Sequence, residues 1–143
     1  MARQRMKLWK CANCNREFAK RNQWHSCLVH TVAHHFRGAD PQLRQTYDLL
    51  IKRLREFGPL RVDAVKSGIN LVSKYHFGGV AVRRHYIRLG FLSDEVIGDA
   101  RIIRRRKQGP KRVSHWVRLR SPSDVDGRLV SWLKKAHALQ AGE

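Results

Sequence analysis

The stretch that most clearly indicates the fold is RVSHWVRLR, residues 112–120. Apolar and polar side chains alternate along it, since Val113, Val117 and Leu119 occupy odd positions and Trp116 an even one. A period of two directs the odd positions to one face of a β-strand and the even positions to the other. The stretch therefore predicts a strand with one buried face and one cationic, aromatic face.

Similar but shorter patterns precede this strand. They cover residues 62–66, 69–75, 80–84, 85–92 and 101–107. Turns are predicted between them at Gly68, Gly78-Gly79, Ser93-Asp94 and Gln108-Gly109-Pro110. The sequence thus predicts five or six short strands that form an antiparallel sheet.

Two amphipathic helices flank the predicted strands. Asp40 and Pro41 are typical of a helix start, a stripe of apolar residues at spacings of three and four follows, and Gly58-Pro59 ends it. Ser121-Pro122-Ser123-Asp124 resembles a capping box ahead of a second apolar stripe. A sheet and two helices with one apolar face each combine most simply with both helices on one face of the sheet.

The charge of the chain points to a polyanionic partner. Its 143 residues contain 30 Lys or Arg and 11 Asp or Glu, which gives a formal net charge of +19. The excess is concentrated in residues 1–39 and residues 61–120. Such a balance favours binding to nucleic acid, and less readily to an anionic membrane surface. The sequence has no long apolar run and no secretory signal, so we expect a cytoplasmic protein without a membrane segment.

All three cysteines lie in the first fifth of the chain, close to histidines. Cys11-Ala12-Asn13-Cys14 has the spacing of half a zinc site. The second half is either His25 with Cys27 or Cys27 with His30, and the spacing leaves both sets open. Because four protein ligands fill a tetrahedral zinc sphere, we expect one structural Zn²⁺ ion.

The two parts of the chain are expected to meet near Arg37-Gly38-Ala39. Residues 1–38 then form a zinc-knuckle region and residues 39–143 form the main domain. The predicted fold class is α+β, an antiparallel sheet of five or six strands with two flanking helices on one face, preceded by a small zinc knuckle.

The cysteines belong to a longer motif. It reads Trp9-x-Cys11-x-x-Cys14-x-Arg16-x-Phe18, then Asn22-Gln23-x-His25-Ser26-Cys27, then His35-Phe36-x-Gly38. With Gly58-Pro59, Val65-Lys66-Ser67-x-Ile69 and His115-x-Val117-Arg118-Leu119, it resembles a bacterial family known only as a domain of unknown function (number 5655). The resemblance implies zinc ligation by Cys11, Cys14, His25 and Cys27, although Asn15 stands where the family usually has glycine. It implies no activity.

The strongest functional signal is the basic run RIIRRRKQGPKR, residues 101–112. Strands lie about 4.8 Å apart, so such side chains would form a cationic patch whose spacing suits phosphates. Trp116 is a candidate for stacking on bases. The predicted nucleic-acid-binding residues are Arg83, Arg84, Arg88, Arg101, Arg104, Arg105, Arg106, Lys107, Lys111, Arg112, Trp116, Arg118 and Arg120.

These features predict a zinc-containing, non-catalytic protein that binds DNA or RNA, rRNA included, through phosphates and shape. One alternative is an enzyme that acts on nucleic acid or a phosphorylated substrate with His115 as general base. Another is a ribosome-associated or protein-interaction module. We predict no catalytic residue and expect His115 to be a half-buried histidine with satisfied hydrogen bonds. The sequence does not predict an oligomeric state.

Overall fold

The computed structural model describes residues 8–10, 12, 17–18 and 31–141. The chain forms two compact units, Met1–His30 and Thr31–Glu143, which are considered separately. In the first unit, strand β1 (Trp9–Lys10) pairs antiparallel with β2 (Glu17–Phe18), and Trp9 lies opposite Phe18. The predicted zinc ligands Cys11, Cys14, His25 and Cys27, and the alternative His30, lie outside the described residues.

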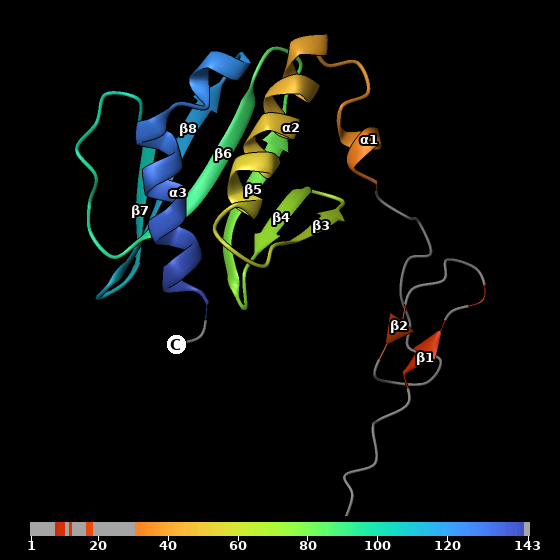
Figure 1. Ribbon diagram of the computed structural model, residues 1–143, viewed down its shortest axis with the longest axis horizontal. Helices are drawn as coiled ribbons and strands as arrows, with labels where there is room; N and C mark the ends of the chain where they lie inside the picture. The colour runs from red at the N-terminus through yellow and green to blue at the C-terminus, as the bar shows by residue number, and fades with distance from the viewer. Residues whose placement is uncertain (1–7, 11, 13–16, 19–30, 142–143) are drawn as a thin grey trace, which may run out of the picture. The chain divides into compact units, whose positions relative to one another are not determined.

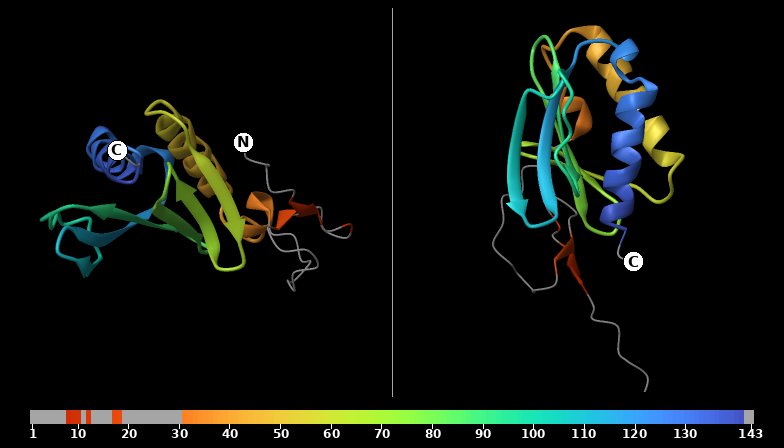
Figure 2. Two further views of the ribbon diagram at one scale, coloured as in Figure 1. Left: turned by 90° about the horizontal axis from the view of Figure 1, so that it is seen from below. Right: turned by 90° about the vertical axis from the view of Figure 1, so that its left-hand side faces the viewer.

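The second unit contains a six-stranded antiparallel sheet with the strand order β3-β4-β5-β6-β8-β7 (Figure 1). Its strands are β3 (Arg61–Val65), β4 (Gly68–Val72), β5 (His76–Val82), β6 (Ile87–Ser93), β7 (Arg104–Gly109) and β8 (Arg112–Leu119). Helices α2 (Pro41–Arg55) and α3 (Gly127–Leu139) lie on the same face of the sheet (Figure 2). This arrangement confirms the predicted α+β fold. Within the described part of the chain, no helix is both long and apolar enough to span a bilayer.

The core lies between the sheet and the two helices. Leu50 of α2, Leu133 of α3 and Leu89 of β6 are fully buried there. Leu89 pairs in register with Val117, which is also fully buried, so the alternation read from the last strand faces the helices as predicted. Burying each of these aliphatic side chains contributes about 1.5–3 kcal/mol relative to exposing it.

A short helix precedes α2 within the second unit and contacts its sheet. Helix α1 (Val32–His35) is capped by Thr31, whose side chain accepts a hydrogen bond from the His34 N–H. The His35 ring lies 2.7 Å from the carbonyl oxygen of Val65 in β3. The compact unit therefore begins at Thr31, ahead of the boundary near residue 38 that the sequence suggested.

The predicted turn at Gly78-Gly79 is wrong. Both glycines lie inside β5, and the chain reverses at residues 73–75. A Cβ atom at Gly78 would lie 2.7 Å from the carbonyl oxygen of Gly90 in the neighbouring strand, closer than real Cβ atoms approach. Glycine is used here for close approach of two backbones rather than for a turn.

The second helix begins later than the sequence suggested. The capping box of Ser121 and Asp124 is present, but it caps a single 3₁₀ turn, η1 (Pro122–Asp124). Helix α3 has its own cap, because the Asp126 side chain accepts a hydrogen bond of 3.0 Å from the Leu129 N–H. Two capping residues in succession thus divide the segment into a turn and a helix.

Candidate nucleic-acid interface

The sheet has a second face, opposite α2 and α3, which we call the open face because no described helix covers it (Figure 2). Residues paired across antiparallel strands share a face. Leu89 and Val117 point toward the helices, so their chain neighbours in β6 and β8 point to the open face. By the same register, the open face carries Asn70, Gly79, Ala81, Arg88, Gly90, Arg104, Arg106, Ser114, Trp116 and Arg118.

Four arginines of the open face lie on three neighbouring strands. Arg88 of β6 is directly opposite Arg118 of β8, and Arg104 and Arg106 of β7 are opposite Trp116 and Ser114. None of these four arginines forms an ion pair with a carboxylate of the described residues. Like charges directly opposite one another destabilise a sheet. An anion bound at this face would offset that repulsion.

Aromatic rings lie beneath two of these cations. The guanidinium carbon of Arg104 is 5.3 Å from the ring centroid of Trp116, and that of Arg118 is 5.0 Å from the ring of Tyr86. Each such contact is worth about 0.5–1 kcal/mol at an exposed site. The open face therefore combines positive charge with aromatic surface.

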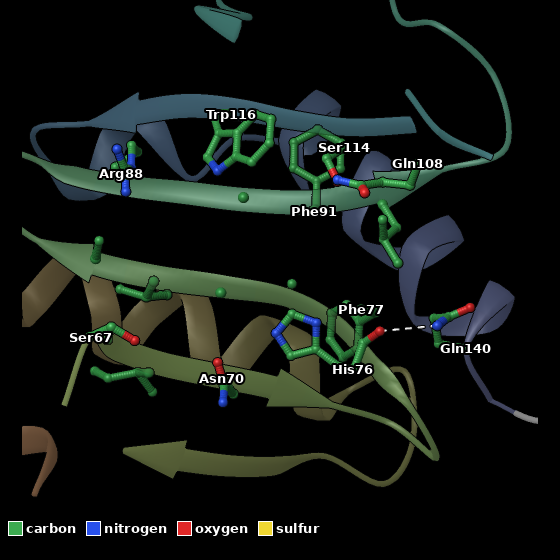
Figure 3. A pocket seen from close by; sticks show the side chains of 18 of the residues that line it. Ser67, Asn70, His76, Phe77, Arg88, Phe91, Gln108, Ser114, Trp116 and Gln140 are labelled. Carbon is green, nitrogen blue, oxygen red and sulfur yellow. Dashed lines mark hydrogen bonds between the residues drawn. The ribbon is translucent and has the colours of Figure 1, made fainter. Parts of the chain in front are cut away.

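A cavity of ≈ 600 Å³ opens in the same face (Figure 3). Trp116 and Arg88 lie on its β6–β8 side, and Asn70 and His76 lie on its β4–β5 side. The strands β5 and β6 beneath it present glycine where other residues have side chains, at Gly79 and Gly90. These glycines make the cavity a hollow in the surface of the sheet.

Amide and hydroxyl groups gather at one end of this cavity. The Gln108 amide donates to the Ser114 hydroxyl at 3.1 Å, and the Gln140 amide donates to the His76 carbonyl at 3.0 Å. Arg112 donates from Nε to the Gln140 side-chain oxygen at 3.3 Å. The lining residues include the cations Arg88 and Arg112 and no carboxylate.

The alternation of β7 divides the basic run that the sequence singled out. Arg105 and Lys107 pair with His115 and Val113, so they point away from Arg104 and Arg106. Arg105 donates from Nε and Nη2 to the Ile97 carbonyl, at 2.9 and 2.7 Å. Of the four consecutive cations at residues 104–107, only Arg104 and Arg106 therefore belong to the open face.

Arg101 has a role in the fold. Its Nη1 donates to both carboxylate oxygens of Asp126 at 3.0 Å, and its Nη2 donates to the Asp124 carbonyl at 2.7 Å. The Leu129 N–H, and after it Arg101, lower the pKa of Asp126. Arg101 thus joins the loop before β7 to the cap of α3.

The remaining predicted cations lie at the ends of strands. Arg83 and Arg84 are exposed in the turn between β5 and β6, close in sequence to Arg88. Lys111 is exposed in the turn between β7 and β8, and Arg120 is exposed directly after β8.

His115 lies on the helix side of the sheet and does not line the cavity. It is fully buried, its Nε2 accepts a hydrogen bond of 3.0 Å from the Ile97 N–H, and its ring stacks on Phe91. Its Nδ1 has no hydrogen-bond partner among the described residues. The prediction of a half-buried histidine is therefore wrong, and the predicted hydrogen bonding is found at only one of the two ring nitrogens. Burial, and after it the charge of Arg105, lowers the pKa of His115.

Sequence reasoning missed most of the cavity. Asn70 comes from β4, His76 from β5 and Gln140 from the end of α3, and no local pattern links the three. One signal was present, since Gly90 occupies an open-face position inside β6 without any neighbouring turn residue. Such a glycine marks a close approach to the backbone, and here the approaching group is the Trp116 indole, whose Nε1 would lie 2.8 Å from a Cβ at residue 90.

Comparison with known proteins gave one finding. A family model described as Domain of unknown function (DUF5655) matches residues 32–140, so the match leaves the cysteine segment outside. Neither the curated proteins nor the solved structures gave a match. Among the residues that the structure describes, no group of three His, Cys, Asp or Glu side chains is arranged to hold a metal ion.

Proposed function

The chain belongs to the family described as Domain of unknown function (DUF5655), and we propose that it is a non-catalytic nucleic-acid-binding protein whose contact surface is the open face. The proposal extends to DNA and RNA, rRNA included, and to readout of phosphates and shape more than of base sequence. The knuckle region belongs to the same proposal as a structural zinc site.

One observation carries this proposal. Arg88 and Arg118 lie directly opposite each other, with Arg104 and Arg106 on the next strand, and no described carboxylate pairs with any of them. Elsewhere in the unit, carboxylates do pair with arginines, as Asp99 does with Arg128. Unpaired cations a strand spacing apart suit a chain of phosphates, and each neutralised phosphate releases counterions.

The aromatic side chains favour nucleic acid over other polyanions. Trp116 and Tyr86 lie beneath Arg104 and Arg118, so charge and ring surface come together. Proteins that bind single strands combine a cationic groove with rings on which bases stack. A purely electrostatic surface for other polyanions would gain nothing from these rings.

The zinc site is proposed with Cys11, Cys14, His25 and Cys27 as ligands, and with His30 as the alternative to His25. The antiparallel pairing of Trp9–Lys10 with Glu17–Phe18 supports it, because the two strands bracket the Cys11–Cys14 pair in the sequence. Hairpins that bracket such a pair are common in small zinc domains. The metal would supply much of the folding free energy of the first unit.

The proposal is tested by neutralising the open face. We expect R104Q/R106Q/R118Q to weaken binding to a labelled RNA or DNA oligonucleotide by about two orders of magnitude at about 0.1 M salt, since each lost phosphate contact removes about 0.9 from the slope of log K against log salt. Fluorescence anisotropy measures the affinity of the wild type and that of the triple variant.

The matched control removes the same charge from the helix side. Lys52, Arg55 and Lys134 are exposed on α2 and α3. K52Q/R55Q/K134Q is expected to bind within about threefold of the wild type, because only the general field of the protein changes. An equal loss of affinity in both triple variants would refute the open face as the contact surface.

A further inference from the structure

The cavity in the open face is large enough for a specific ligand. Its volume of ≈ 600 Å³ lies within the range of about 300–1,000 Å³ typical of small-molecule sites. It has a glycine floor, an aromatic side, a polar end and cations without carboxylates among its lining residues. A flat phosphate-binding surface needs no such hollow.

The cavity floor contains two adjacent glycines, and an aromatic ring lies above each of them. Gly79 and Gly90 are register partners on β5 and β6. The pyrrole ring of Trp116 lies over Gly90, and Nε2 of His76 lies 3.9 Å from the position of a Cβ at Gly79. Two rings from different strands thus lie above adjacent glycines, as the views of Trp116 and His76 in Figure 3 illustrate.

The cavity also offers free polar groups. The Trp116 indole N–H and the Asn70 amide make no hydrogen bond to any described residue, and both line the cavity. Gln108 and Gln140 each use part of their hydrogen-bonding capacity within the protein. Amide and indole groups of this kind hydrogen-bond the edges of unpaired bases.

We propose that the cavity holds one unpaired nucleotide of a single-stranded nucleic acid, with its base against Trp116 and His76 and its phosphate on Arg88. This inference rests on the proposed nucleic-acid-binding function and deepens it, because it assigns a preferred form of the ligand. In a duplex the edges of each base are paired and its faces stacked, so a base reaches such a cavity only if it is flipped out. The protein therefore prefers single strands to duplexes of the same sequence.

The test fills the cavity without disturbing the backbone. A Cβ at Gly79 would meet only ordinary contacts, the Ile69 carbonyl at 3.7 Å and His76 at 3.9 Å, so Gly79→Leu directs its side chain into the hollow. Affinities are measured at one salt concentration for a single strand of about 12 nucleotides and for its duplex. The wild type is expected to prefer the single strand by about fivefold to a hundredfold, the effect of stacking one base.

Gly79→Leu is expected to remove this preference and to leave the affinity for the duplex unchanged. Gly98→Leu is the matched control, since nothing lies within 4 Å of a Cβ at this exposed glycine, and it is expected to keep the preference. Trp116→Ala is a second variant, and it is also expected to lose the preference for single strands. The Trp116 side chain lies outside the helix-facing core. This second variant keeps the test decisive if Gly79→Leu fails to fold.

The outcomes separate this inference from the function on which it rests. Equal wild-type affinity for strand and duplex, or a preference that survives both Gly79→Leu and Trp116→Ala, overturns the nucleotide cavity and leaves the proposed function standing. Binding to neither form overturns the proposed function itself. A nucleoside monophosphate that binds as tightly as the strand would make a free nucleotide the occupant and overturn the strand assignment.

Discussion

At the scale of single residues, His115 shows how the helix side of the sheet differs from the open face. Its ring is fully buried against Phe91, accepts one hydrogen bond from the Ile97 N–H and lies near Arg105. Desolvation and a nearby positive charge both disfavour the protonated ring. The residue is placed to fill the core and hold the 94–102 loop, and it does not reach the cavity.

His115 makes the stability of the protein depend on pH. Its pKa is lowered in the folded state from 6.5, so below about pH 6.5 the unfolded chain binds more protons than the folded one. Stability is therefore complete above that pH and is lost as the pH falls, by at most about 1.4 kcal/mol per pH unit for this one group.

The measurement is the urea midpoint at pH 7.5 and pH 5.5. We expect His115→Phe, which keeps the stacked ring, to lower the midpoint at pH 7.5 because the Ile97 N–H loses its acceptor. The drop between the two pH values should nevertheless become smaller in this variant. An unchanged drop would mean that His115 is not the source of the pH dependence.

At the scale of elements, strand β5 explains the clearest error of sequence reasoning. A Gly-Gly pair between apolar residues usually marks a turn. Here Gly78 permits close approach to the backbone of β6, and Gly79 opens the cavity floor. Whether a Gly-Gly pair forms a turn or lies inside a strand depends on the strand that pairs with it. That strand, here β6, lies further along the chain, so the residues next to the glycines do not reveal it.

The two glycines are therefore expected to respond differently to substitution. Gly78→Ala should destabilise the protein by about 1–3 kcal/mol, the usual effect of overpacking, because its Cβ would clash with the Gly90 carbonyl at 2.7 Å. Gly79→Ala should stay within about 0.5 kcal/mol of the wild type, as substitutions outside the core do. Chemical denaturation measures both, and equal effects would contradict the assigned roles.

Other elements could be predicted because their signals are local. The alternation of β8 and the stripe of α2 each contain enough information to define a buried face, and both faces are buried as expected. The cavity could not be predicted, since its lining comes from the five strands β4 to β8 and needs their register at once. The basic run of residues 104–107 was seen, but its division between two faces follows only from the pairing of β7 with β8.

At the scale of the whole molecule, the chain divides into two compact units with different sources of stability. The second unit has a core of buried apolar residues between sheet and helices, whereas the first is proposed to depend on zinc. We expect one zinc per chain by elemental analysis and its loss in Cys14→Ser. The thermal transition of the second unit should persist when a chelator removes the metal, because every buried residue of the described core lies within that unit.

The fourth ligand is identified by comparing His25→Ala with His30→Ala. The histidine whose substitution abolishes zinc binding is the ligand. The family resemblance seen in the sequence implies that it is His25. Purified protein without any bound metal would contradict the zinc site.

The charged side chains of the second unit have a clear spatial order. Asp99, Asp124 and Asp126 lie with Arg101 and Arg128 near the start of α3, where the charges are compensated. The arginines of the open face have no such compensation among the described residues. We therefore propose that the chain binds polyanions through this one surface.

The salt dependence of nucleic-acid binding is the decisive test of the open face as the contact surface. Arg88, Arg104, Arg106 and Arg118, with Arg83 and Arg84 in the adjoining turn, predict a slope of log K against log salt of about −5 on duplex DNA. In R104Q/R106Q/R118Q the slope should fall to about −3, since three contacts are lost. A wild-type affinity that does not change with salt, or a slope that the triple variant leaves at its wild-type value, would contradict the account.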